Sequence, residues 1–118
     1  VVERSKNHSI TIELPFDYVR IDSDENYGGI AANTGEGGLL AYLPEAIEIG
    51  ILLKLEILFV KGLELNTIKA ITKVVWSDLG ARESWGEYRY GLQFQSFQEG
   101  DLPKLKMLLK EVGKAYDQ

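Results

Sequence analysis

The spacing of the apolar residues changes near residue 100, and this change most constrains how the chain can fold. Before that point, apolar and polar residues alternate in short runs, as they do in half-buried β-strands. The clearest runs are residues 9–14, 51–60, 68–76 and 88–95. After that point, apolar residues recur every three or four positions, which is the period of an amphipathic helix. The sequence therefore predicts a β-rich body followed by one C-terminal helix.

The strand runs also predict which side chains face the core. In the run 68–76, Ile68, Val74 and Trp76 fall on one face, so we expect Trp76 to be buried with the other two. Pro15 follows the first run and is expected to interrupt its ladder, because proline has no N–H to donate. We further predict a polar loop over residues 22–29 and another strand over residues 39–43.

The C-terminal segment predicts a helix whose apolar side packs on the strands. That side consists of Leu102, Leu105, Leu108, Leu109 and Val112. Asp101 is a suitable N-cap, and Pro103 is tolerated in a first helical turn. Several antiparallel strands followed by one helix indicate a small all-β-dominated barrel or sandwich with a helical flank.

Composition narrows the class of protein. The chain has 118 residues, enough for one domain, with strands over about 9–95 and a helix over about 101–116. Its net charge of −5 argues against DNA or RNA as a partner, since both need a basic surface. There is no cysteine and no apolar run long enough to span a membrane. We therefore expect a cytoplasmic protein.

Residues 33–38 form the most suggestive local motif, a turn between two short strands that reads Asn-Thr-Gly-Glu-Gly-Gly. Its three glycines can take a positive φ and bring backbone N–H groups close to a ligand. Asn33 adds two donors and one acceptor. Most glycine-rich turns are only turns, so the motif alone does not establish a site.

Other chemistry has little support in the sequence, and we predict no enzymatic activity and no cofactor. His8 is the only histidine and has no cysteine beside it, so no metal site is predicted. Residues 22–26 begin like a calcium loop, but Tyr27 stands where that loop needs glycine. Arg82 and Trp85 lie in a long connection and are candidate anchors for a protein partner, since Arg and Trp are frequent at interfaces.

The order of several segments resembles the PilZ domain family over nearly the whole chain. A basic start precedes a strand that ends in Glu-Leu-Pro at residues 13–15, and the glycine-rich turn follows. A later strand closes on Val75-Trp76, and residues 88–94 read Tyr-Arg-Tyr-Gly-Leu-Gln-Phe before the final helix. The resemblance implies a six-stranded antiparallel β-barrel with a C-terminal helix. It also implies binding of the bacterial second messenger cyclic di-GMP.

The family binds this messenger with two motifs, an Arg-x-x-x-Arg segment before the first strand and Asp/Asn-x-Ser-x-x-Gly on the barrel. By this resemblance, the candidate ligand residues are Arg4, His8, Asn33, Gly35 and Gly38. Asn33 and Gly38 match their motif positions, whereas Gly35 replaces the serine. Arg4 is followed four residues later by His8; a count back from Glu-Leu-Pro places the arginine positions near residues 5 and 9, which are serines. Either count leaves the arginine pair incomplete.

The lost groups predict a weak site. Arginine offers a charged planar fork to phosphate, whereas a histidine offers at most two donors and is mostly neutral at pH 7. We therefore interpret the chain as a signalling domain of cyclic di-GMP regulation whose nucleotide binding is weak or absent. The alternative is an adaptor module that binds no nucleotide. The resemblance implies a protein partner in the control of motility, exopolysaccharide or biofilm.

Overall fold

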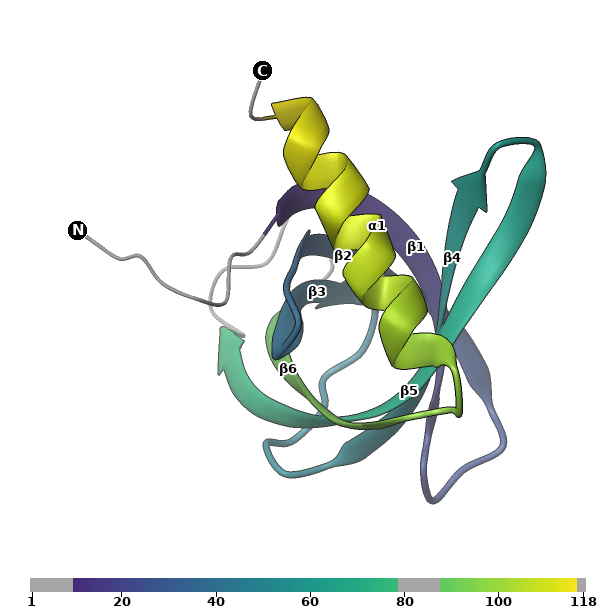
Figure 1. Ribbon diagram of the computed structural model, residues 1–118. Coiled ribbons are helices and arrows are strands. Elements are labelled where there is room, and N and C mark those ends of the chain that lie inside the picture. The colour runs from purple at the N-terminus through teal and green to yellow at the C-terminus, as the bar shows by residue number, and fades with distance from the viewer. Residues whose placement is uncertain (1–9, 79–87, 117–118) are drawn as a thin grey trace.

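The six strands close into an antiparallel barrel with one helix at the C-terminus (Figure 1). The computed structural model describes residues 10–78 and 88–116. The elements are β1 (Ile10–Arg20), β2 (Asn26–Thr34), β3 (Gly38–Leu43), β4 (Leu52–Lys61), β5 (Glu64–Asp78), β6 (Tyr88–Phe97) and α1 (Asp101–Tyr116). Around the barrel, the strand order is β1-β2-β3-β6-β5-β4. The β-rich body and the C-terminal helix predicted from the apolar spacing are both confirmed.

The barrel interior is filled by side chains from alternate positions of every strand. In β4, Leu53, Leu55 and Ile57 are buried, while Lys54 between them is exposed. Phe16 of β1 is also buried in this core. Because small closed barrels are filled by their own side chains, the interior has no room for a ligand. Any ligand must therefore bind on the outside.

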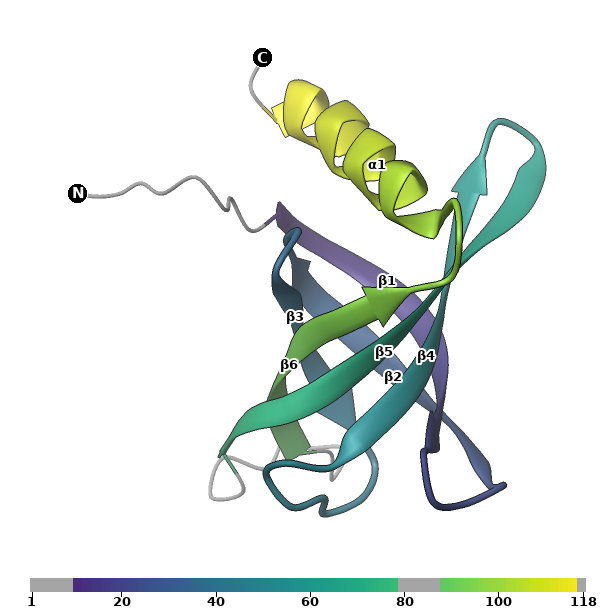
Figure 2. The same cartoon turned by 60° about the horizontal axis from the view of Figure 1, so that its bottom comes forward.

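Helix α1 lies across one end of the barrel (Figure 2). Its buried side consists of Leu105, Leu108 and Leu109, as the apolar spacing predicted. Asp101 also fixes the helix, but its carboxylate does so by accepting a hydrogen bond of 2.7 Å from the backbone N–H of Lys69 in β5. The same carboxylate, predicted as the N-cap of the helix, also lies 3.5 Å from the Lys104 Nζ.

The loop between β3 and β4 lies at the opposite end of the barrel (Figure 2). Two buried tyrosines hold it. Tyr18 donates a hydrogen bond of 2.8 Å to the Glu45 carboxylate. The Tyr90 hydroxyl accepts one of 2.6 Å from the Ile47 N–H and donates one of 3.0 Å to the Glu45 carbonyl. Burial, and next the hydrogen bond to Glu45, raise the pKa of Tyr18 far above the usual value for a tyrosine.

Two sequence predictions about β1 and β2 need correction. Pro15 does not end β1, which pairs with β2 from Ile10 to Val19 with one register shift between Thr11 and Leu14. The predicted loop over residues 22–29 is shorter, because β2 begins at Asn26. Gly29 lies within this strand, where an added Cβ would stand 2.7 Å from Leu43. Gly29, the last residue of the predicted loop, is therefore a strand residue that makes room for core side chains.

Within residues 10–78 and 88–116, no helix combines the length and the apolar character needed to cross a membrane.

Candidate functional site

A β-bulge in β2 places Asn33 on the outer wall of the barrel. Ala31 pairs with Ala41 of β3, and Asn33 pairs with Leu40, so Ala32 is an extra residue without an opposite partner. A bulge reverses which residues face inward beyond it. Asn33 is accordingly half-buried, whereas Thr34 is fully buried and its hydroxyl has no hydrogen-bond partner among the described residues.

The glycine-rich turn is held tightly against β6. The Gly35 N–H donates to the Gly38 carbonyl at 2.9 Å, and the Phe94 N–H of β6 donates to the Gly37 carbonyl at 2.9 Å. A Cβ on Gly38 would lie only 2.2 Å from the carbonyl oxygen of Leu92. Gly38 is therefore required by the close approach of β3 to β6.

We expected positive φ angles to explain the glycines of this turn, and for two of them that expectation is wrong. Gly37 and Gly38 do not adopt the left-handed region, which is occupied by Gly50, Gly62 and Gly100 elsewhere in the chain. An added Cβ on Gly37 would have no atom within 4 Å. Of these two glycines, only Gly38, the last residue of the motif, is needed for steric reasons, and this role does not depend on a ligand.

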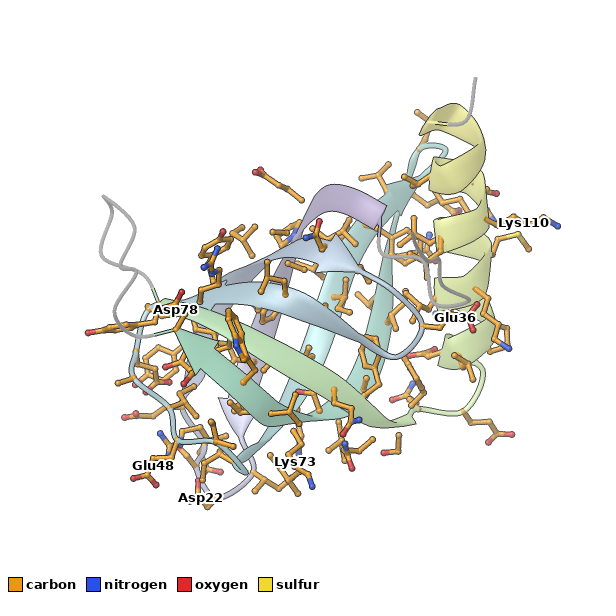
Figure 3. All side chains as sticks on the ribbon, turned by 90° about the vertical axis from the view of Figure 1, so that its left-hand side faces the viewer. Asp22, Glu36, Glu48, Lys73, Asp78 and Lys110 are labelled. Atoms are coloured by element: carbon orange, nitrogen blue, oxygen red, sulfur yellow. The ribbon has the colours of Figure 1, made fainter. Side chains whose placement is uncertain are left out.

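The strand register places Asn33 in a row of residues that crosses four neighbouring strands on the outer wall. The row consists of Asn33 in β2, Leu40 in β3, Gly91 in β6 and Trp76 in β5. Directly opposite residues in antiparallel strands share one face of the sheet. Figure 3 views the molecule from this side, with Glu36, Lys73 and Asp78 labelled around the wall.

Trp76 lies on the outer wall, which contradicts the prediction that it is buried with Val74. A register shift between Val74 and Trp76 inserts an extra residue into β5 and turns the indole outward, leaving it 43% exposed. The side chain packs over Gly91, whose added Cβ would lie 3.2 Å from the Trp76 Cβ. Gly91 therefore leaves room for the indole on the surface of β6.

Arg89 supplies a positive charge beside this indole. Its guanidinium carbon lies 5.6 Å from the centre of the Trp76 ring, within the range of cation–π attraction. One nitrogen forms an ion pair of 2.8 Å with Asp78. This hydrogen bond, and then one with Tyr42, raise the pKa of Arg89. Together, four side chains form a polar and aromatic cluster beside the row that contains Asn33: Trp76, Arg89, Asp78 and Tyr42.

The structure therefore brings some of the predicted site residues together. Asn33, Gly35 and Gly38 lie in one segment that runs from the end of β2 to the start of β3. Four other predicted residues fall outside the described part of the chain: Arg4, His8, Arg82 and Trp85. Sequence reasoning did not assign Trp76 or Arg89 to a site. Both lie in segments that carried the resemblance, but their place beside Asn33 depends on the register of four strands.

In the part of the chain that the structure describes, no three His, Cys, Asp or Glu side chains are grouped to hold a metal ion.

The closed barrel and its helix match solved structures, although the sequence itself matches no family model and no curated protein. The Bacillus subtilis inhibitor of motility MotI/DgrA aligns with a TM-score of 0.74 and 14% identity, over 98% of this chain and 52% of that one. The PilZ domain of YcgR from Escherichia coli, solved with c-di-GMP, aligns with a TM-score of 0.69 and 9% identity, over 97% and 95%.

The complex of MrkH from K. pneumonia with c-di-GMP aligns with a TM-score of 0.64 and 16% identity, over 100% of this chain and 55% of MrkH. The chain thus spans about half the length of MotI/DgrA and of MrkH. Likeness at these identities shows a shared fold. The chain has a PilZ-like fold, which confirms the predicted barrel and the family resemblance that suggested it.

Proposed function

We propose that this chain is a non-enzymatic signalling domain of bacterial cyclic di-GMP regulation, and that it binds the messenger weakly or not at all. Two of its structural neighbours were solved with c-di-GMP, which supports this messenger as the ligand to test. Asn33 supports a place for it, because the bulge at Ala32 turns this side chain to the outer wall. Its amide can both donate and accept hydrogen bonds there.

The observation that carries the weak binding is the inward orientation of Thr34. Its hydroxyl is the only one in the turn, and it lies fully inside the barrel. Gly35, at the serine position, has no hydroxyl to offer. One arginine of the pair is also replaced. The loss of the serine hydroxyl and of this arginine removes at least one charged hydrogen bond to the ligand, worth about 1.5–3 kcal/mol. Binding is then about one to two orders of magnitude weaker, because each 1.4 kcal/mol is about tenfold.

Trp76 and Arg89 partly offset this loss in our proposal. A flat exposed indole is a surface on which a purine can stack, and such stacking contributes about 1–3 kcal/mol per base. Arg89 lies beside it with a permanent positive charge that attracts phosphate. Its pairing with Asp78 reduces the charge available to a ligand, so these residues do not replace the missing arginine.

Titration calorimetry with cyclic di-GMP tests this proposal. We expect little or no heat from the unchanged chain up to about 100 µM ligand. The double variant His8→Arg/Gly35→Ser restores both motif positions and is expected to bind at least tenfold more tightly. Adding Asn33→Ala should abolish the gain, whereas Asn26→Ala, an exposed asparagine of the same strand, should not. Micromolar binding by the unchanged chain would contradict the weak-site part of the proposal.

The alternative function is an adaptor that binds a protein and no nucleotide. The exposed Trp76 with Arg89 at its side favours this alternative, since tryptophan and arginine are the commonest anchors of protein interfaces. Arg82 and Trp85 remain predicted contributors. A partner acting in motility, exopolysaccharide or biofilm control is proposed from the resemblance alone. Failure of the restored double variant to bind nucleotide would favour the adaptor.

A further inference from the structure

The seam between β1 and β4 opens at Pro15. The Ile21 N–H donates to the Leu52 carbonyl at 3.0 Å, which shows that odd-numbered residues of β1 direct their N–H groups toward β4. Hydrogen-bonded pairs recur at every second residue of an antiparallel ladder. Counting back, the pair after Asp17 would join Pro15 to Leu58. Proline cannot donate, and in the described strands the last pair of β1 with β4 is Phe16 with Ile57.

Strand β4 continues beyond this point with one unpaired edge. Its pairing with β5 extends to Lys61 and Glu64, so the backbone stays extended. By the same alternation, Leu58 and Val60 direct their N–H and C=O groups away from β5, toward the open seam. No strand in the described part of the chain pairs with this side of them. An unpaired edge is a template for another extended segment.

The open seam forms a groove of about 670 Å³ between β1, the projecting hairpin of β4 and β5, and α1. Figures 1 and 2 both show this hairpin projecting beside the helix. The lining is mainly apolar and includes Leu14, Phe59, Leu108 and Val112. Among the described residues that line it, the charged ones are Glu13 and Glu111. Val60, at the edge, is 68% exposed.

We propose that this groove binds an extended segment of a partner protein, which adds to β4 as an antiparallel strand. The unpaired groups of Leu58 and Val60 would bond its backbone, as in other cases of strand addition. Its inward side chains would be apolar, to cover the groove. Lysine or arginine would stand beside Glu13 and Glu111. This surface involves β1, β4 and α1, so the proposal is independent of the nucleotide site on the outer wall.

The same observations disfavour other occupants. A phosphate-containing ligand would meet an apolar wall and two carboxylates, with no cation among the lining residues described. A second copy related by a two-fold axis would bring its own Glu13 and Glu111 to the same interface, where like charges repel. An extended partner segment with apolar and basic side chains would avoid both the burial of phosphate beside carboxylates and the repulsion between like charges.

The test is selection of peptides from a random 12-residue phage library on the unchanged chain, after depletion on the Val60→Pro variant. Proline at this position removes the N–H that points into the groove and leaves the bonds to β5 intact. We expect enriched peptides with alternating apolar residues and at least one Lys or Arg. The synthetic consensus peptide is then the probe, and fluorescence anisotropy measures its affinity.

Each variant has a matched control. Affinity should fall about tenfold in Val60→Pro, which loses one backbone hydrogen bond, and stay the same in Val60→Thr, which keeps it. It should fall about fivefold in Glu111→Lys and not in Glu99→Lys, an exposed carboxylate away from the groove. Asn33→Ala, which acts on the nucleotide site, should not change it.

Hydrogen exchange provides a readout that does not require a variant. Bound peptide should protect the N–H groups of Leu58 and Val60 and leave that of exposed Trp76 unchanged. The proposal is overturned if no peptide is enriched, if Val60→Pro binds as well as Val60→Thr, or if these two amides stay unprotected. A dimer that protects the same amides without peptide would also overturn it, in favour of a second copy as the occupant.

Discussion

Replacing Gly38 by alanine tests how far the glycine-rich turn serves the fold. The added methyl group would lie 2.2 Å from the Leu92 carbonyl oxygen and 3.2 Å from the Gln93 Cα. Real Cβ atoms do not come within 3.0 Å of such a neighbour, and the obstacle is backbone, which cannot rotate away. Strand β3 must therefore move about 1 Å away from β6, which weakens the pairing of these two strands.

The expected loss of stability has two parts. Overpacking that shifts a backbone costs about 1–3 kcal/mol. The shift also stretches neighbouring ladder bonds, such as that from the Phe94 N–H to the Gly37 carbonyl, each worth about 1 kcal/mol. The free energy of unfolding should therefore fall by about 3 kcal/mol. For a domain of this size, that corresponds to a fall in Tm of about 10 °C.

Urea unfolding monitored by circular dichroism measures this change, and Gly37→Ala is its control. Gly37 lies one residue away in the same turn, but its added methyl group would meet nothing within 4 Å. The control should be neutral or more stable by about 0.5 kcal/mol, because alanine restricts the unfolded chain. Equal stability of the two variants would refute the steric argument and leave a ligand as the reason for Gly38.

Three further predictions concern the two ends of the barrel. Tyr90→Phe leaves the Ile47 N–H and the Glu45 carbonyl in the β3–β4 loop without their hydrogen-bond partner. It should lower the free energy of unfolding by about 2 kcal/mol in urea titrations. Asp101→Ala leaves the N–H of Lys69 without its partner and should cost about 1–3 kcal/mol, with loss of helix signal at lower temperature; an unchanged melt would contradict the docking role. The raised pKa of Tyr18 means that the unfolded chain releases this proton first. Stability should hold below about pH 10, the unfolded value, and fall above it, and Tyr18→Phe should show a shallower alkaline decline in melts from pH 8 to 11.

The β-rich body and its C-terminal helix could be predicted from the sequence because the core follows simple periods, whereas the closed six-stranded barrel was implied by the family resemblance. Alternation located β4 and the later strands, and the change of period located α1. The bulges could not be predicted, because an extra residue leaves no mark in composition. This is why Trp76 was assigned to the core, whereas the register shift after Val74 turns it outward.

The candidate site was only partly predictable for a related reason. The resemblance to the family's ligand motif predicted Asn33 and Gly38 as candidate site residues. Their proximity to Trp76 depends on the strand pairings that connect β2 to β5 through β3 and β6. Together these pairings bring Asn33 next to Trp76, a residue more than forty positions later in the chain, and no local sequence pattern predicts that. Gly38 shows a second reason why the site was hard to predict. The motif suggests a ligand contact at this residue, but a glycine is also needed there because β3 lies close to β6.

The bulge at Ala32 sets how homologous chains could vary at this place in β2. The side chain of Ala32 could be exchanged for many others, because the extra residue has no opposite partner in β3. Its deletion would restore simple alternation, and Asn33, then next to inward-facing Ala31, would still face outward with Thr34 inward. Homologous chains should therefore tolerate both substitution and deletion of Ala32 without a change in the direction of Asn33. The direction of Asn33 depends on its pairing with Leu40 of β3, and the number of residues before it in β2 can vary.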